Sequence, residues 1–342
     1  MRFTLRRGTN ISHWLSQSDA RGDERRRRFT REDVARLAAL GLDHLRLPVD
    51  EEQLWDDQGA PHEEAWDLLQ EGMDWLLEAG LNAVVDLHIL RTHHFNEGPK
   101  PLFTEAAAAQ AFAECWHKIS ERLRDRPLDR VAYELLNEAV ADDPADWNRV
   151  LHLAYRDVRA LEPKRCLVLG SNRWNSVAQY EFLDVPADDR DIILTFHYYH
   201  PMPVTHYRAP WTWQLKDYKG PIQYPGLAVP QEAFNALPPD QQRRVGGVNT
   251  LGGAAVMEAD LMWPLAVAAR TGLPLYCGEF GVVANAPDAI RAAWLKDFLA
   301  VMARHGIAWA NWDFRGDFGL FTADNRKTVA CSALYPNRNR KI

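Results

Sequence analysis

The sequence lacks any apolar run long enough to cross a membrane. A membrane-spanning helix needs about 18 consecutive apolar residues, and no stretch of the 342-residue chain approaches that length. The first residues, Met1-Arg2-Phe3-Thr4, also lack the apolar region of a secretory signal peptide. We therefore expect no membrane partner, and either a cytoplasmic protein or a secreted one whose leader is not part of this chain.

Cysteine is scarce and shows no pairing pattern. The four cysteines, Cys115, Cys166, Cys277 and Cys331, lie far apart, and none belongs to a Cys-x-x-Cys motif. Two of them fall inside apolar strand patterns, so we expect buried free thiols and no requirement for an oxidising compartment. Histidines at 88, 93 and 94 suggest a metal, but no carboxylate or cysteine completes a recognisable ligand spacing. We expect neither a metal nor another cofactor.

An excess of positive charge is also missing. The chain has 40 Lys and Arg against 47 Asp and Glu, a net charge of −7. The phosphates of nucleic acids and of anionic membranes would repel such a protein, so we expect neither as a partner. The one basic cluster, residues 25–28, is interpreted as a solvated loop or helix end.

Short apolar runs alternate with longer helical patterns along the chain. The first long helical pattern opens with a capping box at Thr30-Arg31-Glu32-Asp33 and closes at Gly41. The short runs are apolar on both faces, which is typical of buried parallel strands. The expected strands are residues 5–10, 44–49, 83–88, 131–138, 166–170, 192–198, 273–279 and 307–312, and the expected helices are about residues 31–40, 63–79, 105–124, 145–161, 176–182, 254–270 and 287–305.

This alternation predicts an α/β protein with a closed (β/α)8 TIM barrel, a single domain of residues 1–342. An open doubly wound sheet is the alternative, but no Gly-x-Gly-x-x-Gly turn follows the first strand. Residues 200–252 interrupt the alternation with a long loop after the sixth strand, a feature that is usually functional or has minor structure of its own. After Trp312 the periodicity is weak, so we expect a short, irregular or missing eighth helix and a polar tail at residues 337–342.

Two of the expected strands end in a glutamate. Glu138 closes the run Val131-Ala132-Tyr133-Glu134-Leu135-Leu136-Asn137-Glu138, and Glu279 closes the run that starts at Leu273. Neighbouring strand ends exclude water from a carboxyl group at such a position and raise its pKa, which suits general acid–base catalysis. Two such groups are what glycoside hydrolysis requires. Alternatively, Asn137 and Glu138 simply cap the following helix.

Other polar and aromatic residues follow the strands at the same end, where the catalytic groups of such barrels stand. Each has a structural alternative: Arg46 as an ion pair, His88 as a strand-end histidine, and Trp312 as barrel filling. Eight such residues at one end of one barrel nevertheless favour a sugar-binding site. The candidates are Trp14, Arg46, His88, Asn137, Trp174, His197, Tyr199 and Trp312, together with Glu138 and Glu279.

Six motifs carry a resemblance to a known family. They are Leu45-Arg46-Leu47-Pro48, Asp86-Leu87-His88, Asn137-Glu138, His197-Tyr198-Tyr199, Gly278-Glu279-Phe280-Gly281 and Asn311-Trp312. Their types and order resemble glycoside hydrolase family 5, the cellulase-type retaining β-glycosidases, over about residues 8–320. The resemblance implies that Glu138 is the acid/base and Glu279 the nucleophile, and that the other candidates line the subsite of the cleaved sugar.

The chemistry of a retaining glycosidase gives several candidates a role. Glu279 must be ionised to attack the anomeric carbon, and Arg46 and Tyr199 would favour its charged form. Glu138 must start protonated, and His197 would orient it. The expected sugar contacts are the 2-hydroxyl for Asn137, another hydroxyl for His88 and the ring face for Trp312.

The long loop contains aromatic residues that would wall one end of the cleft and decide whether chains pass through it. They would alternatively form a small core within the loop. These aromatics are Tyr207, Trp211, Trp213, Tyr218 and Tyr224.

The function expected from these features is retaining hydrolysis of β-glycosidic bonds by an endo-β-1,4-glucanase. The partner is then a β-linked oligo- or polysaccharide, and we expect the enzyme to be a monomer. An exo-acting β-glucosidase, a β-mannanase and an inactive carbohydrate-binding barrel remain alternatives. A sugar-phosphate isomerase or lyase is disfavoured, because the seventh and eighth strands lack a glycine-rich phosphate loop.

Overall fold

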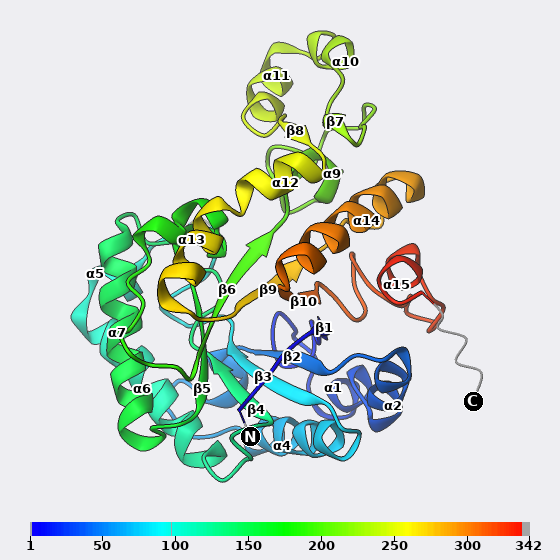
Figure 1. Cartoon of the computed structure of the whole chain (residues 1–342). Helices are drawn as coiled ribbons and strands as arrows, with labels where there is room; N and C mark the ends of the chain where they lie inside the picture. The colour runs from blue at the N-terminus through cyan, green and yellow to red at the C-terminus, as the bar shows by residue number, and fades with distance from the viewer. Residues whose placement is uncertain (1, 97, 337–342) are drawn as a thin grey trace. The chain divides into compact units, whose positions relative to one another are not determined.

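The protein contains a closed barrel of eight strands, in the computed structural model that describes residues 2–96 and 98–336. Neighbouring strands pair in parallel wherever the barrel register is resolved, for example His44 with Asn82 and Val49 with Leu87. The predicted (β/α)8 barrel is therefore confirmed (Figure 1). Around the barrel the strands are β1 (Arg7–Asn10), β10 (Ala308–Asn311), β9 (Leu275–Phe280), β6 (Ile192–Tyr198), β5 (Cys166–Gly170), β4 (Val131–Glu134), β3 (Asn82–Leu87) and β2 (His44–Val49).

The strands are buried because both of their faces are apolar. Every residue of β2, β4, β5, β6 and β9 is buried, as expected for a parallel sheet covered by helices. One core cluster joins residues from six strands and one that precedes the barrel. Its members are Phe3, Val84, Ala132, Cys166, Val168, Ile193, Tyr276 and Ala310.

Contacts divide the chain into two compact units. One comprises the described residues of Met1–His197, Trp263–Gly278 and Ala308–Ala310, and the other comprises those of Tyr198–Met262, Glu279–Ile307 and Asn311–Ile342. The strands β6, β9 and β10 each contribute residues to both units.

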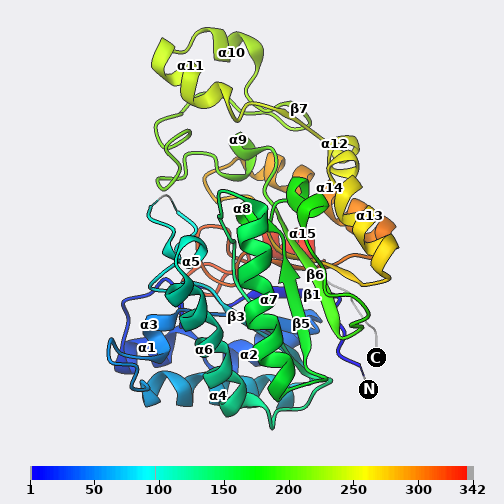
Figure 2. The same cartoon turned by 90° about the vertical axis from the view of Figure 1, so that its left-hand side faces the viewer.

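In the first unit, helices follow the strands on the outside of the sheet. The helix α2 begins at the predicted capping box, since Thr30 and Asp33 bond each other's backbone, and ends at Gly41 with φ of 82°. The long helices α6 and α7 run side by side (Figure 2). The helices that lie wholly in this unit are α1 (Gly22–Arg28), α2 (Arg31–Leu40), α3 (Glu51–Leu54), α4 (Glu63–Glu78), α5 (Pro101–Thr104), α6 (Ala106–Leu123), α7 (Pro144–Leu161), α8 (Asn172–Asn175) and the 3-10 helix η1 (Val177–Phe182).

The basic cluster at residues 25–28 forms the end of α1, as predicted, but it is not fully solvated. Arg25 is buried, and its guanidinium donates to Gln53 Oε1 and to the carbonyl of Ala20. The other three arginines of the cluster are exposed.

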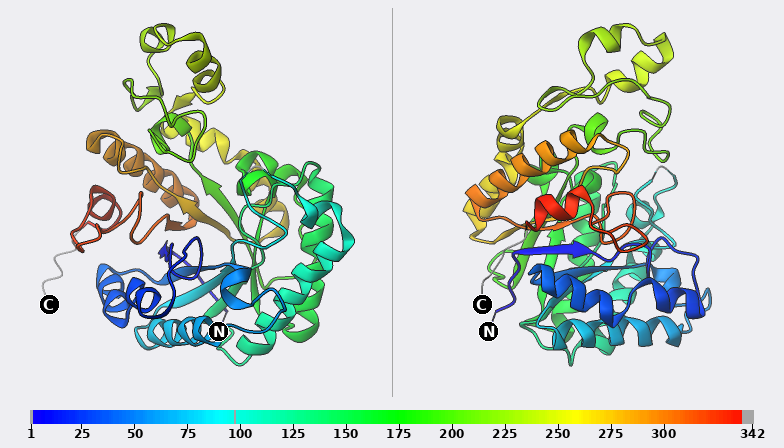
Figure 3. Two further views of the ribbon diagram at one scale, coloured as in Figure 1. Left: turned by 180° about the vertical axis from the view of Figure 1, so that it is seen from behind. Right: turned by 90° about the vertical axis from the view of Figure 1, so that its right-hand side faces the viewer.

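In the second unit, the helices α14 and α15 lie side by side (Figure 3, orange and red). The eighth helix is short, as predicted: α15 has six residues and follows the turns and bridge of residues 312–328. The predicted tail at 337–342 lies outside the described residues. The elements of this unit beyond the barrel strands are α9 (Met202–Thr205), β7 (Gly226–Leu227), α10 (Gln231–Asn235), α11 (Pro239–Gly246), β8 (Leu251–Gly252), α12 (Ala254–Asp260), α14 (Asp288–His305) and α15 (Val329–Leu334).

The long segment after β6 has minor structure of its own. Strands β7 and β8 pair antiparallel, and α10 and α11 pack together. Tyr207, Tyr218 and Tyr224 are buried, and the first two donate to the carbonyls of Gly220 and Pro221. Tyr207 and Tyr218 pack against each other within the segment, whereas Tyr224 donates to Asp297 Oδ2 of α14 at 3.0 Å.

The sequence analysis was wrong about one helix. The single helix expected over residues 254–270 is two helices, α12 and α13 (Met262–Thr271). Pro264 has no backbone N–H to donate to the carbonyl of Asp260, so the helical ladder is interrupted there. No helix in the described part of the chain is long and apolar enough to span a membrane.

Candidate active site

Glu138 lies four residues beyond the end of β4, and not at the end of the strand as predicted. The backbone leaves the strand gradually, since Leu135 N–H still bonds to Val168 O and Asn137 N–H bonds to Leu87 O at 3.1 Å. The indole of Trp116 donates to Leu135 O at 2.7 Å. Glu138 itself has φ of 47°, a left-handed conformation that is uncommon for a non-glycine residue. Neighbouring strands and a buried tryptophan therefore fix the course of the chain that presents this carboxyl group.

His197, on β6, holds the Glu138 side chain. Its Nδ1 lies 2.8 Å from Glu138 Oε1, and its Nε2 lies 3.3 Å from the amide nitrogen of Asn175. The Glu138 side chain is only 13% exposed. Burial raises its pKa to about 7, the charge of Glu134 adds to that rise, and Arg46 opposes it. Glu138 is thus a carboxyl group that still holds its proton near neutral pH.

Arg46, on β2, is completely buried and organises the polar groups beneath Glu138. Its Nε and Nη2 donate to the two carboxylate oxygens of Glu134 at 2.7 and 3.0 Å. Its Nη1 donates to Asn10 Oδ1 at 2.8 Å, and its Nη2 also lies 3.0 Å from Asn137 Oδ1. The guanidinium therefore fixes the side chain of Asn137.

His88 follows β3 and is held from both sides. Its Nδ1 lies 2.7 Å from Asp86 Oδ2, and its Nε2 lies 3.1 Å from the side-chain amide of Gln17. Burial lowers the pKa of His88 well below its usual value, so its imidazole is neutral. Burial also raises the pKa of Asp86 to about 7, although Arg46 opposes the rise. Both ring nitrogens of this buried imidazole have protein partners, so a sugar hydroxyl would bond His88 only in place of Gln17.

Glu279 is the fifth residue of β9 and is 5% exposed. The hydroxyl of Tyr199 donates to its Oε2 at 3.0 Å, which favours the ionised carboxylate. The ring of Tyr199 is itself held edge-on by His206 and Phe318, at centroid distances of 5.1 and 5.8 Å. The preceding residue must be glycine, because a Cβ at Gly278 would lie 2.7 Å from the hydroxyl oxygen of Thr195.

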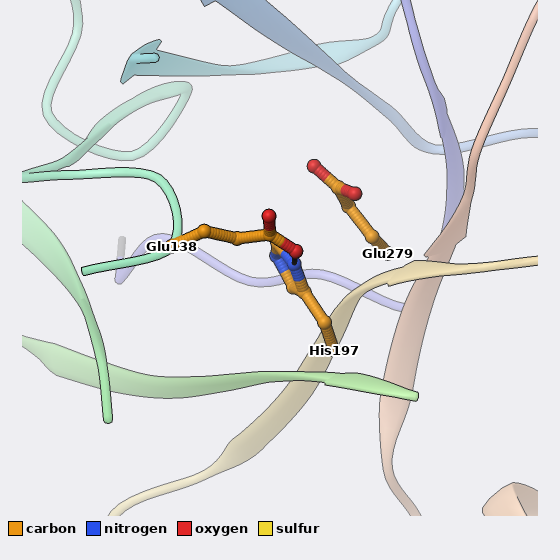
Figure 4. A group of neighbouring side chains, drawn as sticks. All are labelled: Glu138, His197 and Glu279. Carbon is orange, nitrogen blue, oxygen red and sulfur yellow. Dashed lines mark hydrogen bonds and ion pairs between the residues drawn. The ribbon is translucent and has the colours of Figure 1, made fainter. Parts of the chain in front are cut away.

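Glu138, His197 and Glu279 form one group (Figure 4). Each offers a polar atom, and these atoms all lie within 4.8 Å of one another. Two glutamates in different surroundings, one contacting an imidazole and one accepting from a phenol, suit glycoside hydrolysis. The same atoms could geometrically hold a metal ion, but the chemistry of a carboxyl pair requires none.

The prediction that Trp14 contacts the substrate is wrong. Its side chain is 1% exposed and packs edge-on against Phe29 at 5.0 Å. It also fills the space above Gly72, where a Cβ would lie 2.8 Å from the indole. Because both faces of the ring are covered by protein, Trp14 belongs to the core and cannot stack on a sugar.

The other two predicted tryptophans are accessible. Trp174 is 47% exposed, and its indole nitrogen donates to Phe95 O at 2.7 Å. Trp312 is partly buried. Its backbone N–H bonds at 2.9 Å to the carbonyl oxygen of Phe280, the residue that follows Glu279. Both side chains therefore keep some solvent exposure, which sugar stacking requires.

The three histidines that suggested a metal site contact polar side chains or aromatic rings of the protein. Both ring nitrogens of His88 face Asp86 and Gln17. His93 is buried against Phe103, and burial lowers its pKa to about 4. His94 lies against the ring of Phe95.

The sequence analysis missed the buried partners of the site. Asp86 and Glu134 are carboxyl groups inside otherwise apolar strands, and that contrast is a signal that could have identified both. Gln17 lies in a loop after β1, where no sequence pattern marks it.

Comparisons with known proteins agree with this arrangement. The model of the cellulase family, glycosyl hydrolase family 5, matches residues 12–317. Endoglucanase C of Acetivibrio thermocellus is 28% identical over 333 residues, covering 96% of both chains. Cellodextrinase A of Ruminococcus flavefaciens is 29% identical over 309 residues, covering 88% of this chain and 83% of the relative.

Solved structures share the fold. The endoglucanase Cel5A from the hyperthermophilic Thermotoga maritima superimposes with a TM-score of 0.77 at 23% identity, covering 96% of each chain. This likeness supports the barrel, and the family model supports the motifs on it. Since that model spans most of the sequence, the chain belongs to glycosyl hydrolase family 5, the cellulase family.

Proposed function

We propose that the protein is an endo-β-1,4-glucanase that cleaves β-glucan with retention of anomeric configuration, acting as a monomer with one catalytic domain. Its family and the endoglucanases among its relatives support the substrate class. The observation that carries the mechanism is the grouping of Glu138, His197 and Glu279, whose polar atoms lie within 4.8 Å. Retaining enzymes need their two carboxyl groups closer together than inverting enzymes do, because no water stands between carboxylate and sugar.

In the first step, Glu138 donates its proton to the oxygen of the glycosidic bond. The carboxylate of Glu279 attacks the anomeric carbon, so the bond to the leaving sugar breaks as an ester to Glu279 forms. The raised pKa of Glu138 keeps the proton available near neutral pH. Tyr199 stabilises the attacking charge through its hydrogen bond to Glu279.

In the second step, Glu138 is ionised and acts as a base. It removes a proton from water, the water attacks the anomeric carbon, and the ester to Glu279 breaks. Because Glu279 is neutral while it is esterified, the pKa of Glu138 falls at this stage, which suits its change of role. His197 keeps Glu138 in place throughout through the 2.8 Å contact.

The remaining predicted residues would bind the sugar. Asn137, oriented by Arg46, would bond the 2-hydroxyl, and the neutral His88 would bond a neighbouring hydroxyl. Trp312 would support one face of the ring. Trp174 would contact the chain further out, where it is exposed.

A second candidate has a specific observation behind it. One relative is named Cellodextrinase A, which favours action on short cello-oligosaccharides in place of long chains. An inactive binding barrel has weaker support, since both glutamates of the hydrolase motif are present. A β-mannanase would use the same two glutamates, so activity on mannan distinguishes it.

Product analysis on a panel of polysaccharides tests the proposal. The panel contains carboxymethylcellulose, mixed-linkage β-glucan, glucomannan, mannan and laminarin, with matching oligosaccharides. An endo-β-1,4-glucanase lowers the viscosity of the first two sharply before reducing sugar accumulates. Release of small sugars from oligosaccharides alone would support the second candidate, and inactivity on every substrate would overturn both.

A further inference from the structure

Two completely buried carboxyl groups contact one guanidinium, which also bonds the residue before the proposed acid/base. The side chains of Arg46, Asp86 and Glu134 are completely buried, and that of Glu138 is 13% exposed. Arg46 Nε and Nη2 bind both oxygens of Glu134, and its Nη2 lies 3.0 Å from Asp86 Oδ2. Glu134 therefore takes two of the hydrogen bonds that this guanidinium donates.

One guanidinium cannot compensate three buried carboxyl groups, those of Asp86, Glu134 and Glu138, if all of them ionise. Ionising a buried carboxyl group costs free energy unless a cation compensates it. Glu134 is compensated by its two-point contact with Arg46, and Asp86 by a single atom. The proton therefore stays on the carboxyl groups that receive less of the guanidinium's charge. Glu138 is one of these: Arg46 Nη2 lies 3.0 Å from Oδ1 of the preceding residue, Asn137, while the Glu138 carboxyl group itself contacts the imidazole of His197.

Three other titratable groups around the cluster are neutral at neutral pH. His88 is neutral because burial lowers its pKa. Tyr276 and Tyr180 are neutral because burial raises their pKa values well above the usual one. The remaining groups that face Glu134 or Glu138 are His197 on β6, His93 after β3, Glu279 and Cys277 on β9, and the guanidinium of Arg46 on β2.

We propose that Glu134 is a positioning residue that keeps Glu138 in its acid form by occupying Arg46. The inference rests on the proposed function, in which Glu138 is the proton donor. Without the charge of Glu134, Arg46 would be only partly compensated. Its positive charge would then stabilise the ionised form of Glu138, and the acid would lose its proton at a lower pH.

The test is the pH profile of kcat/KM for Glu134→Gln on a soluble β-glucan. The basic limb of this profile reports the group that must be protonated in the free enzyme. Since removal of a neighbouring negative charge lowers the pKa of a carboxyl group, we expect the basic limb to move to lower pH by about one unit. An unmoved basic limb in a folded Glu134→Gln protein would overturn the proposal.

Two control variants distinguish the effect of losing the charge of Glu134 from the effect of a general loss of stability. Glu134→Asp keeps the charge, so its basic limb should stay at the wild-type pH even if its rate falls. Glu162→Gln removes one partner of another buried pair, in which Arg165 Nε donates to Glu162 Oε2 at 2.7 Å. This pair precedes β5, at the opposite end of the strands, so Glu162→Gln should lower stability without moving the limb. Equal shifts in Glu134→Gln and Glu162→Gln would also contradict the proposal.

A second variant covers the case in which Glu134→Gln does not fold. Asp86→Asn removes the other carboxyl group that Arg46 contacts. Because burial raises the pKa of Asp86 to about 7, this group is only partly ionised at neutral pH, so the basic limb should move in the same direction but by less. The profile of Glu138→Gln on an activated aryl glycoside distinguishes the two hypotheses. If the basic limb persists there, Glu138 is not the acid and the proposed function fails. If the limb disappears there but is unmoved in both charge variants, only the role of Glu134 fails.

Discussion

Glu138 and Glu279 have the same side chain but different surroundings, and the difference gives them different chemistry. Glu138 is buried near Glu134 and contacts an imidazole, so its pKa rises to about 7. Glu279 accepts a hydrogen bond from the phenol of Tyr199. At the residue scale, hydrogen-bond partners and burial therefore support the proposed roles of Glu138 as acid and Glu279 as nucleophile.

Glu138→Gln removes the proton donor but keeps the shape of the side chain. We expect kcat/KM on β-glucan to fall by a factor of about 10² to 10⁴, the usual contribution of general acid–base catalysis. An aryl glycoside with an acidic leaving group needs no proton, so its first step should be spared and a burst of phenol should be measured. Equal losses on both substrates would contradict an acid role for Glu138.

Glu279→Ala removes the nucleophile and leaves a space beside the anomeric carbon. Turnover should be abolished, and sodium azide should restore it by attacking the sugar in place of the carboxylate. The product, identified by NMR, should be a glycosyl azide of inverted configuration. The control is Glu258→Ala, a glutamate that pairs with Arg304 and should leave turnover unchanged. Full activity of Glu279→Ala would remove Glu279 from the nucleophile role.

The sequence predicted some of the candidate residues correctly and one of them wrongly. Glu138, His197 and Glu279 were predicted from strand ends and motifs, and the structure places them in one group. Trp14 was predicted for the same reason, yet it points into the core against Phe29. Sequence position gives the height of a residue along a barrel but not the direction of its side chain once the strand has ended.

At the scale of elements, prediction succeeded where a local interaction defines the boundary. The capping box fixed the start of α2, and Gly41 fixed its end. The strand β4 ends earlier than its apolar run. Leu135 and Leu136 lie beyond the strand but are buried by the rest of the fold, so their apolar character does not mark a strand. The segment after β6 has no period, so its short helices and its tyrosine core were not predictable in detail.

One exposed indole of that segment is held by the same rings as Tyr199. Trp211 is 49% exposed and contacts His206 and Phe318, at centroid distances of 6.3 and 6.2 Å. We therefore expect it to stack on a sugar beyond the cleaved bond. Trp211→Ala should raise KM for cellopentaose and cellohexaose about tenfold, equivalent to about 1.4 kcal/mol, and change KM for cellotriose little.

The matched control for this prediction is Trp213→Ala. Trp213 is 53% exposed in the same segment, and its carbonyl accepts from Arg244. Its removal should leave KM unchanged for every chain length. If both variants behave alike, the segment contributes through its overall structure and Trp211 forms no separate sugar contact.

At the scale of the whole molecule, alternation of apolar runs and helical patterns was sufficient to predict the closed barrel. Eight buried strands with helices between them close in few other ways. The buried charges were not predictable from that pattern, because Asp86, Glu134 and Arg46 come from three strands and their meeting depends on the register of the sheet. The fold thus supplies the positions, and the polar groups within it supply the chemistry.

The measurement that tests the central claim most directly is the anomeric configuration of the first product. Cellotetraose is mixed with the enzyme in D2O, and proton NMR follows the anomeric signals before mutarotation. A two-step mechanism through Glu279 predicts that the β-anomer appears first and the α-anomer only later. If the α-anomer appears first, hydrolysis proceeds with inversion, and the assignment of Glu279 as a covalent nucleophile is contradicted.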